Sequence, residues 1–261
     1  MYNQLIKKIT MSFLMIFSLF ITSCETSEEG NYIQWGSDNE TATELIMRGM
    51  FHYYNVEWDM ALSYFKAAVD YDSTSFGSYV MLAWMTPEGD LQDEYIAKAK
   101  KYVQGKNETS NLFVSLFDIP GGEGVRERRH VVWSKMHELE PRGNFIHYYY
   151  AWTKPTVDES IAEFEKLMEK LKSADRSYAH VVNTLAYAYY DKGEKAKAKE
   201  YLDEYLRLYP GNNSNDSMGE YYYFEKDYET SLKYYKKSLE HFRFSVSGND
   251  KVRELEKLLK K

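Results

Sequence analysis

The chain has 261 residues, enough for one ordinary domain or one short array of repeats. It is 44% hydrophobic, which excludes global disorder, and its 14 glycines and 5 prolines are too few for a turn-rich all-β protein. The formal charge of −7 comes without a long basic run, which argues against a nucleic-acid binder, because such proteins neutralise phosphates.

The first 23 residues have the layout of a secretory signal. The pair Lys7-Lys8 precedes an almost wholly apolar stretch, residues 9–21, which is too short to span the hydrocarbon layer. The only cysteine follows it directly, in Ile21-Thr22-Ser23-Cys24. These four residues resemble the bacterial lipobox, and the resemblance implies cleavage before Cys24 and a lipid on its side chain. The alternative is a plain secretory signal with a free cysteine nearby.

Residues 24–41 are polar and acidic and contain few aliphatic side chains, so they predict a tether between the lipid and a folded body. Removal of residues 1–23 takes away Lys7 and Lys8 but no acidic residue. The mature chain then carries 31 basic and 40 acidic side chains, a charge of −9.

From Ala42 onward, amphipathic segments alternate in pairs. Gly49 and Tyr53 share a helical face, and after a short turn Ala61 and Phe65 recur at helical spacing. Small residues let two antiparallel helices approach closely, while the aromatic ring fills the gap between them. The same small-then-aromatic order occurs in six units, counting this one, at steps of about 34 residues, and it stops near residue 245.

This order resembles the tetratricopeptide repeat, a helical hairpin with a period of about 34 residues. The resemblance covers residues 42–245, and it is weakest in the third unit, which is interrupted at Gly121-Gly122. The last two units are also similar to repeat proteins from Bacteroidota. The resemblance implies an all-α fold, a right-handed α-solenoid of about six hairpins. Residues 246–261 are expected to form a capping helix, because an array must cover its exposed end.

No motif for catalysis, a cofactor or a metal stands out. The stretch Gly121-Gly122-Glu123-Gly124 lacks the lysine and the preceding strand of a phosphate-binding loop. His130 and His137 could share a helical face, but two histidines without a fixed third ligand are more typical of packing than of a metal site. A Ser-His-Asp triad could assemble in space, yet no nucleophile elbow points to one. We therefore expect a protein that is not an enzyme and that holds no cofactor or metal.

In tetratricopeptide arrays the first helix of each pair lines the concave side. The register places a largely aromatic row there: Met50, Tyr53, Trp84, Phe145, Tyr149, Trp152, Tyr187, Tyr190 and Tyr223, with polar His180, Asn183, Asp216 and Glu220. Binding surfaces use aromatic side chains because they bury a large area with few rotors. We predict partner contacts from Tyr53, Trp84, Tyr149, Trp152, Asn183, Tyr187, Tyr190, Glu220 and Tyr223. The alternative is that many of these side chains fill the core.

Two classes of function remain open. The first is a protein-binding scaffold or adaptor of the bacterial cell envelope, anchored in the outer membrane through Cys24 on its periplasmic or surface face. Its concave side would hold a protein or peptide partner, and the acidic balance of the chain favours a partner with some positive charge. The second is a surface lipoprotein whose aromatic groove holds a glycan or a peptide.

Overall fold

The structure is a computed structural model that describes residues 30–260. The signal peptide predicted over residues 1–23, and Cys24, lie outside the described residues. Between residues 30 and 260 the regular elements are thirteen α-helices and one 3-10 helix, with no strand. The prediction of an all-α fold with about thirteen helices is therefore confirmed.

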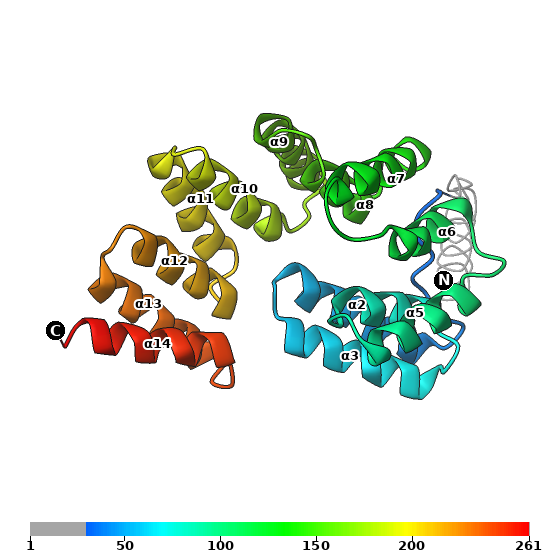
Figure 1. Ribbon diagram of the computed structural model, residues 1–261, viewed down its shortest axis with the longest axis horizontal. Helices are drawn as coiled ribbons and strands as arrows, with labels where there is room; N and C mark the ends of the chain where they lie inside the picture. The colour runs from blue at the N-terminus through cyan, green and yellow to red at the C-terminus, as the bar shows by residue number, and fades with distance from the viewer. Residues whose placement is uncertain (1–29, 261) are drawn as a thin grey trace, which may run out of the picture. The chain divides into compact units, whose positions relative to one another are not determined.

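Figure 1 labels the helices in chain order. Their bounds are α2 Glu40–Tyr54, α3 Trp58–Tyr71, α4 Phe76–Met85, α5 Asp90–Tyr102, α6 Glu108–Ser115, η1 Leu116–Asp118, α7 Val125–Leu139, α8 Asn144–Trp152, α9 Val157–Ser173, α10 Ala179–Asp191, α11 Lys195–Leu208, α12 Asn212–Phe224, α13 Tyr228–His241 and α14 Val246–Leu258.

The α-helices from α2 to α13 form six successive hairpins, each made of two neighbouring helices in the chain. The second helix of each hairpin also contacts the first helix of the next, so the hairpins stack in chain order. The last helix, α14, packs against α13. The six predicted hairpins and the closing helix are thus all present.

Small residues lie where the paired helices come closest. A Cβ atom on Gly49 would stand 2.7 Å from the ring of Phe65, and one on Gly219 would stand 2.9 Å from the ring of Tyr235. Ala198 is completely buried in the fifth hairpin. The small-then-aromatic order seen in the sequence is therefore the contact that closes each of these hairpins.

The third hairpin is the least regular, as its sequence suggested. Helix α6 ends after eight residues and continues as the 3-10 helix η1, and an irregular loop leads into α7. Gly122 and Gly124 in this loop have φ angles of +90° and +73°, which favour glycine because it has no Cβ. The Gly-rich stretch therefore forms a connection between helices.

The tether predicted over residues 24–41 is shorter than expected, because its second half joins the folded unit, which begins at Tyr32. Ile33 is only 4% exposed, and the ring of Trp35 meets those of Phe113 and Phe145 edge-on at 5.6 and 5.1 Å. The backbone N–H of Gln34 also donates to a side-chain hydroxyl of α6, 3.0 Å away. Two apolar side chains in a polar stretch are enough to attach this segment to the folded unit.

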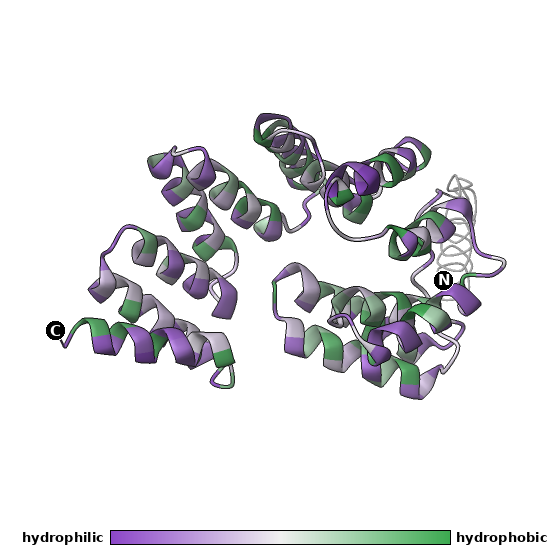
Figure 2. Ribbon diagram, in the orientation of Figure 1, coloured by the Kyte–Doolittle hydropathy of each residue, from purple (hydrophilic) through white to green (hydrophobic). Residues whose placement is uncertain are grey.

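The end of α2 reaches helices far along the chain. The ring of Tyr54 lies 4.5 Å from that of His180 in α10, and the Tyr209 hydroxyl donates to Glu57 at 2.5 Å. The first hairpin therefore meets the fifth hairpin. Figure 2 shows that the helices carry both polar and apolar residues. No helix between residues 30 and 260 is long and apolar enough to cross a membrane.

Candidate functional site

Three residues of the predicted aromatic row meet in the interior. The indole N–H of Trp84 donates to the hydroxyls of Tyr53 at 2.8 Å and Tyr149 at 3.2 Å, and these two hydroxyls also bond to each other. Burial raises the pKa of both tyrosines above the ordinary value. This trio holds the first, second and fourth hairpins together.

Three tyrosines of α10 and α12 bond to carboxylates in the next hairpin or in α14. Tyr187 donates to Glu220 at 2.6 Å, Tyr190 to Glu225 at 2.8 Å, and Tyr223 to Glu254 at 2.6 Å. Burial and the Glu220 carboxylate together raise the pKa of Tyr187. The structure thus brings two predicted site residues, Tyr187 and Glu220, into direct contact with each other. These hydroxyls already have acceptors, and only the faces and edges of their rings are left for a partner.

Asn183 and Trp152 lie in opposite settings. Asn183 is 8% exposed, and its buried Oδ1 has no hydrogen-bond partner within residues 30–260. Trp152 is 52% exposed at the end of α8, stacked at 6.2 Å on Tyr148. It lines a hollow of about 300 Å³ together with Tyr187 and Phe164. Within the predicted row, Trp152 and the neighbouring Tyr187 are therefore best placed to contact a partner. Contact of a partner with all nine predicted residues stays a prediction.

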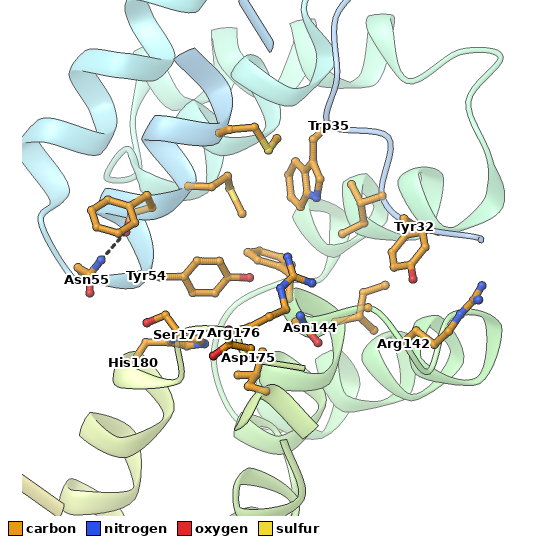
Figure 3. A pocket seen from close by; sticks show the side chains of 18 residues that line it. Tyr32, Trp35, Tyr54, Asn55, Arg142, Asn144, Asp175, Arg176, Ser177 and His180 are labelled. Atoms are coloured by element: carbon orange, nitrogen blue, oxygen red, sulfur yellow. Dashed lines mark hydrogen bonds between the residues drawn. The ribbon is translucent and has the colours of Figure 1, made fainter. Parts of the chain in front are cut away.

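Another cavity lies between the end of α2, the N-terminal segment, the start of α8 and the loop that joins α9 to α10 (Figure 3). We call it the α2–α10 cavity; its volume is about 680 Å³. Trp35, Tyr54 and Phe145 contribute aromatic walls, and Met47, Met50 and Phe51 extend them. This is the size of an ordinary small-molecule site, for which the usual range is about 300–1,000 Å³.

Two polar atoms of residues that line this cavity lack hydrogen-bond partners within residues 30–260. The Oδ1 atom of Asn144 and the Nε2 atom of His180 are buried without a hydrogen bond within residues 30–260. Burial also lowers the pKa of His180 to about 3, so the imidazole is neutral at physiological pH. Arg176 extends from the α9–α10 loop toward Tyr54 (Figure 3). At the rim, Arg142 contacts Glu140 at 3.2 Å.

Only part of this cavity was predictable from the sequence. Met50, Phe145 and His180 belonged to the predicted row on the concave side, Trp35 lay in the predicted tether, and Arg176 was not singled out. No local spacing links residue 35 to residue 176. The only signal available was the pair of apolar residues, Ile33 and Trp35, inside an otherwise polar stretch.

A second hollow, of about 670 Å³, lies on the other side of the α2–α3 turn. It is lined by the exposed ring of Trp58 and by carboxylates that include Asp216 and Asp250. Burial, assisted by the nearby Glu220 carboxylate, raises the pKa of Asp216 to about 6. A carboxylate that is costly to ionise is stabilised by a positive charge, so this hollow favours a cationic group over an anionic one.

The two histidines considered for a metal site are packing residues. The Nδ1 atom of His130 lies 3.0 Å from the Thr153 hydroxyl, and the His137 ring lies between those of His147 and Tyr150, at 4.8 and 4.5 Å. In the described part of the chain no three side chains of the ligating types come together in a way that could hold a metal ion.

Known structures with a similar fold identify the type of helical array. No family model matches the sequence, and no curated protein matches it. The structure is similar to the Cut9-Hcn1 hetero-tetramer of APC/C (TM-score 0.50, 14% identity), with 82% of this chain and 42% of that chain covered. It is similar to yeast Tom70 (TM-score 0.50, 14% identity), covering 84% of this chain and 53% of that chain.

A tetratricopeptide repeat protein from Parabacteroides merdae is similar over most of both chains, with a TM-score of 0.50, 13% identity, and coverage of 82% of this chain and 84% of that one. This chain spans 42% of the Cut9-Hcn1 chain and 53% of the Tom70 chain, less than two thirds of each. Together with the six stacked hairpins, these similarities show that the chain has the tetratricopeptide-repeat fold.

Proposed function

We propose that the protein is a non-enzymatic scaffold or adaptor of the bacterial cell envelope that holds a segment of another protein. The observation that carries this proposal is Trp152, a large aromatic side chain that is 52% exposed beside a hollow of about 300 Å³. Exposed aromatic anchors beside pockets dominate the energetics of protein interfaces. The tetratricopeptide fold supports the proposal by analogy, since Cut9, one of the similar proteins, occurs in a complex with Hcn1.

The charge of the partner follows from the second hollow. Trp58 offers an apolar surface there, and Asp216 and Asp250 supply negative charge. A lysine or arginine side chain can lay its aliphatic part on the indole and its charge near the carboxylates. A partner segment with basic residues is therefore favoured, in agreement with the net charge of −7.

The anchoring of the protein is also part of the proposal. We infer lipidation of Cys24 and attachment to the outer membrane, on its periplasmic or surface face, from the lipobox-like residues 21–24. The test is to replace Cys24 with serine and fractionate the cells. The variant should leave the membrane pellet; if it sediments with membranes as the parent does, the anchor is not at Cys24.

Site-specific photo-crosslinking in whole cells tests the protein-binding face. A photo-reactive residue at position 152 should capture one defined protein, and the same residue at Val131, which is 69% exposed on α7, should not. Trp152→Ala should abolish capture by a second reporter at Asp191 in the same hollow while the helix content stays unchanged. Equally efficient capture at positions 131 and 152 would refute the proposal that the surface around Trp152 binds the partner. Capture at position 191 that is insensitive to Trp152→Ala would refute it as well.

A second candidate function is the binding of a glycan or a peptide, and the α2–α10 cavity is the specific observation that favours it. The two candidates use different residues, because neither Trp152 nor Tyr187 lines that cavity. A pull-down with the anchored protein and a glycan array with the mature chain separate them.

A further inference from the structure

The α2–α10 cavity combines three features that together specify a ligand class. The first is a set of flat apolar walls. The indole of Trp35 and the ring of Phe145 meet at a centroid distance of 5.1 Å, and Tyr54 lies 6.2 Å from the same phenylalanine. The faces of such rings are electron-rich and attract polarised C–H groups. A saturated ring with its C–H bonds turned to these walls therefore fits the cavity.

The second feature is a pair of residues that line the cavity and each carry an orphaned polar atom. Asn144 Oδ1 and His180 Nε2 are buried without partners within residues 30–260, and buried polar groups normally have a hydrogen-bond partner. A half-turn about χ2 exchanges the oxygen and the nitrogen of the Asn144 amide, and each nitrogen of a neutral imidazole is a donor or an acceptor according to the tautomer. A ligand that can both donate and accept hydrogen bonds satisfies either end, and a hydroxyl group does both.

The third feature is the positive charge of Arg176. Figure 3 shows its side chain reaching into the cavity toward Tyr54, and no hydrogen bond or ion pair of its guanidinium is found within residues 30–260. A neighbouring acid, Asp175, also lines the cavity but forms no ion pair with it there. A guanidinium binds a carboxylate through two parallel hydrogen bonds. In a chain with a net charge of −7, an arginine without an acidic partner selects an anionic ligand.

We propose that the α2–α10 cavity binds an acidic sugar, that is, a hydroxylated ring that carries a carboxylate. The ring packs on Trp35 and Phe145, its hydroxyls bond to Asn144 and His180, and the carboxylate bonds to Arg176. This proposal deepens the second candidate function and rests on it; it is independent of the protein-binding face around Trp152.

Isothermal titration calorimetry on the mature chain tests each part separately. The probes are glucuronate, which has the ring, the hydroxyls and the carboxylate; glucose, which lacks the carboxylate; and benzoate, which lacks the hydroxyls. Glucuronate should bind at least ten times more tightly than either of the others. A short glucuronate oligomer distinguishes a free sugar acid from the end of a polysaccharide, because only the latter source predicts tighter binding of the oligomer.

The decisive variant is Arg176→Gln, at an exposed residue whose replacement leaves the core intact. It should weaken glucuronate binding to the level of glucose and leave glucose binding unchanged. The matched control is Arg243→Gln, another exposed arginine, which does not line the cavity and should change neither affinity. The proposal is overturned if glucuronate does not bind, if benzoate binds as tightly, or if Arg176→Gln has no more effect than Arg243→Gln. None of these outcomes would affect the protein-binding proposal, which is tested separately by crosslinking at position 152.

Discussion

The docking of the N-terminal segment depends on a close approach that only glycine allows. A Cβ atom on Gly77, in the first turn of α4, would lie 2.1 Å from the backbone oxygen of Trp35, well inside contact distance. Neither group is a flexible side chain that could swing away. Gly77→Ala must therefore push residues 33–35 off the folded unit, although alanine itself favours a helix.

The size of the effect follows from two opposing contributions. Alanine in place of glycine in a helix stabilises it by up to about 1 kcal/mol. Displacement of the segment exposes Ile33, which is 4% exposed in the native state, and part of the Trp35 ring; full burial of such a side chain contributes about 1.5–3 kcal/mol. We expect a net loss of about 2–4 kcal/mol.

Urea unfolding followed by far-ultraviolet circular dichroism measures this loss. Gly121→Ala is the matched control, since a Cβ atom there meets nothing within 4 Å, and it should leave the midpoint unchanged or slightly raised. The effects of Gly77→Ala and Ile33→Ala should be less than additive, because both act through the same segment. A Gly77→Ala variant as stable as the parent, or fully additive effects, would show that the segment is not docked on α4.

Three further predictions concern the packing of the hairpins. Ala198→Leu should lower the free energy of unfolding by roughly 1–3 kcal/mol, because it overfills a completely buried contact. Ala196→Leu, on the exposed face of the same helix, should leave it unchanged. Equal melting temperatures for the two variants would show that Ala198 is not in a packed contact. Burial lowers the pKa of His147 to about 4, so the unfolded chain binds a proton more readily and stability should fall as the pH drops from about 6.5 to about 4, by about 2–3 kcal/mol at pH near 4.5. His147→Gln should flatten that part of the pH profile, and an unchanged slope would assign it to other groups. Tyr187→Phe should lower the free energy of unfolding by about 1–2 kcal/mol through the lost bond to Glu220, and the loss should vanish in a Glu220→Ala background, which has no acceptor.

The hairpins were predictable because their determinants are local. Gly49 and Phe65, or Gly219 and Tyr235, are 16 residues apart, and a helix–turn–helix must bring such positions together whatever the rest of the chain does. The start of α4 at Phe76 and the irregular third hairpin follow from the same reasoning. The repeat period thus contains enough information for the fold class and for most helix positions.

The site was less predictable because it depends on how the hairpins stack. The contact between Tyr54 and His180 and that between Tyr209 and Glu57 join residues more than a hundred positions apart. A small change in the rotation from one hairpin to the next accumulates along the array and decides whether such residues meet. For the same reason, the register placed Tyr149 and Trp152 on one helix face without indicating that only Trp152 is strongly exposed.

The abundance of tyrosine, 25 residues, has a structural explanation in this arrangement. Tyr148 bonds to Thr184, Tyr187 to Glu220 and Tyr190 to Glu225, and these pairs are separated by 36, 33 and 35 residues. A separation close to one repeat means that each hydroxyl reaches the equivalent helix of the next hairpin. The hydroxyl fixes the next hairpin, which phenylalanine cannot do. These bonds account for tyrosine on the first helices, so a tyrosine-rich row alone does not identify a binding groove. For that reason the proposed binding sites are centred on the exposed Trp152 and on Arg176, and not on the tyrosines.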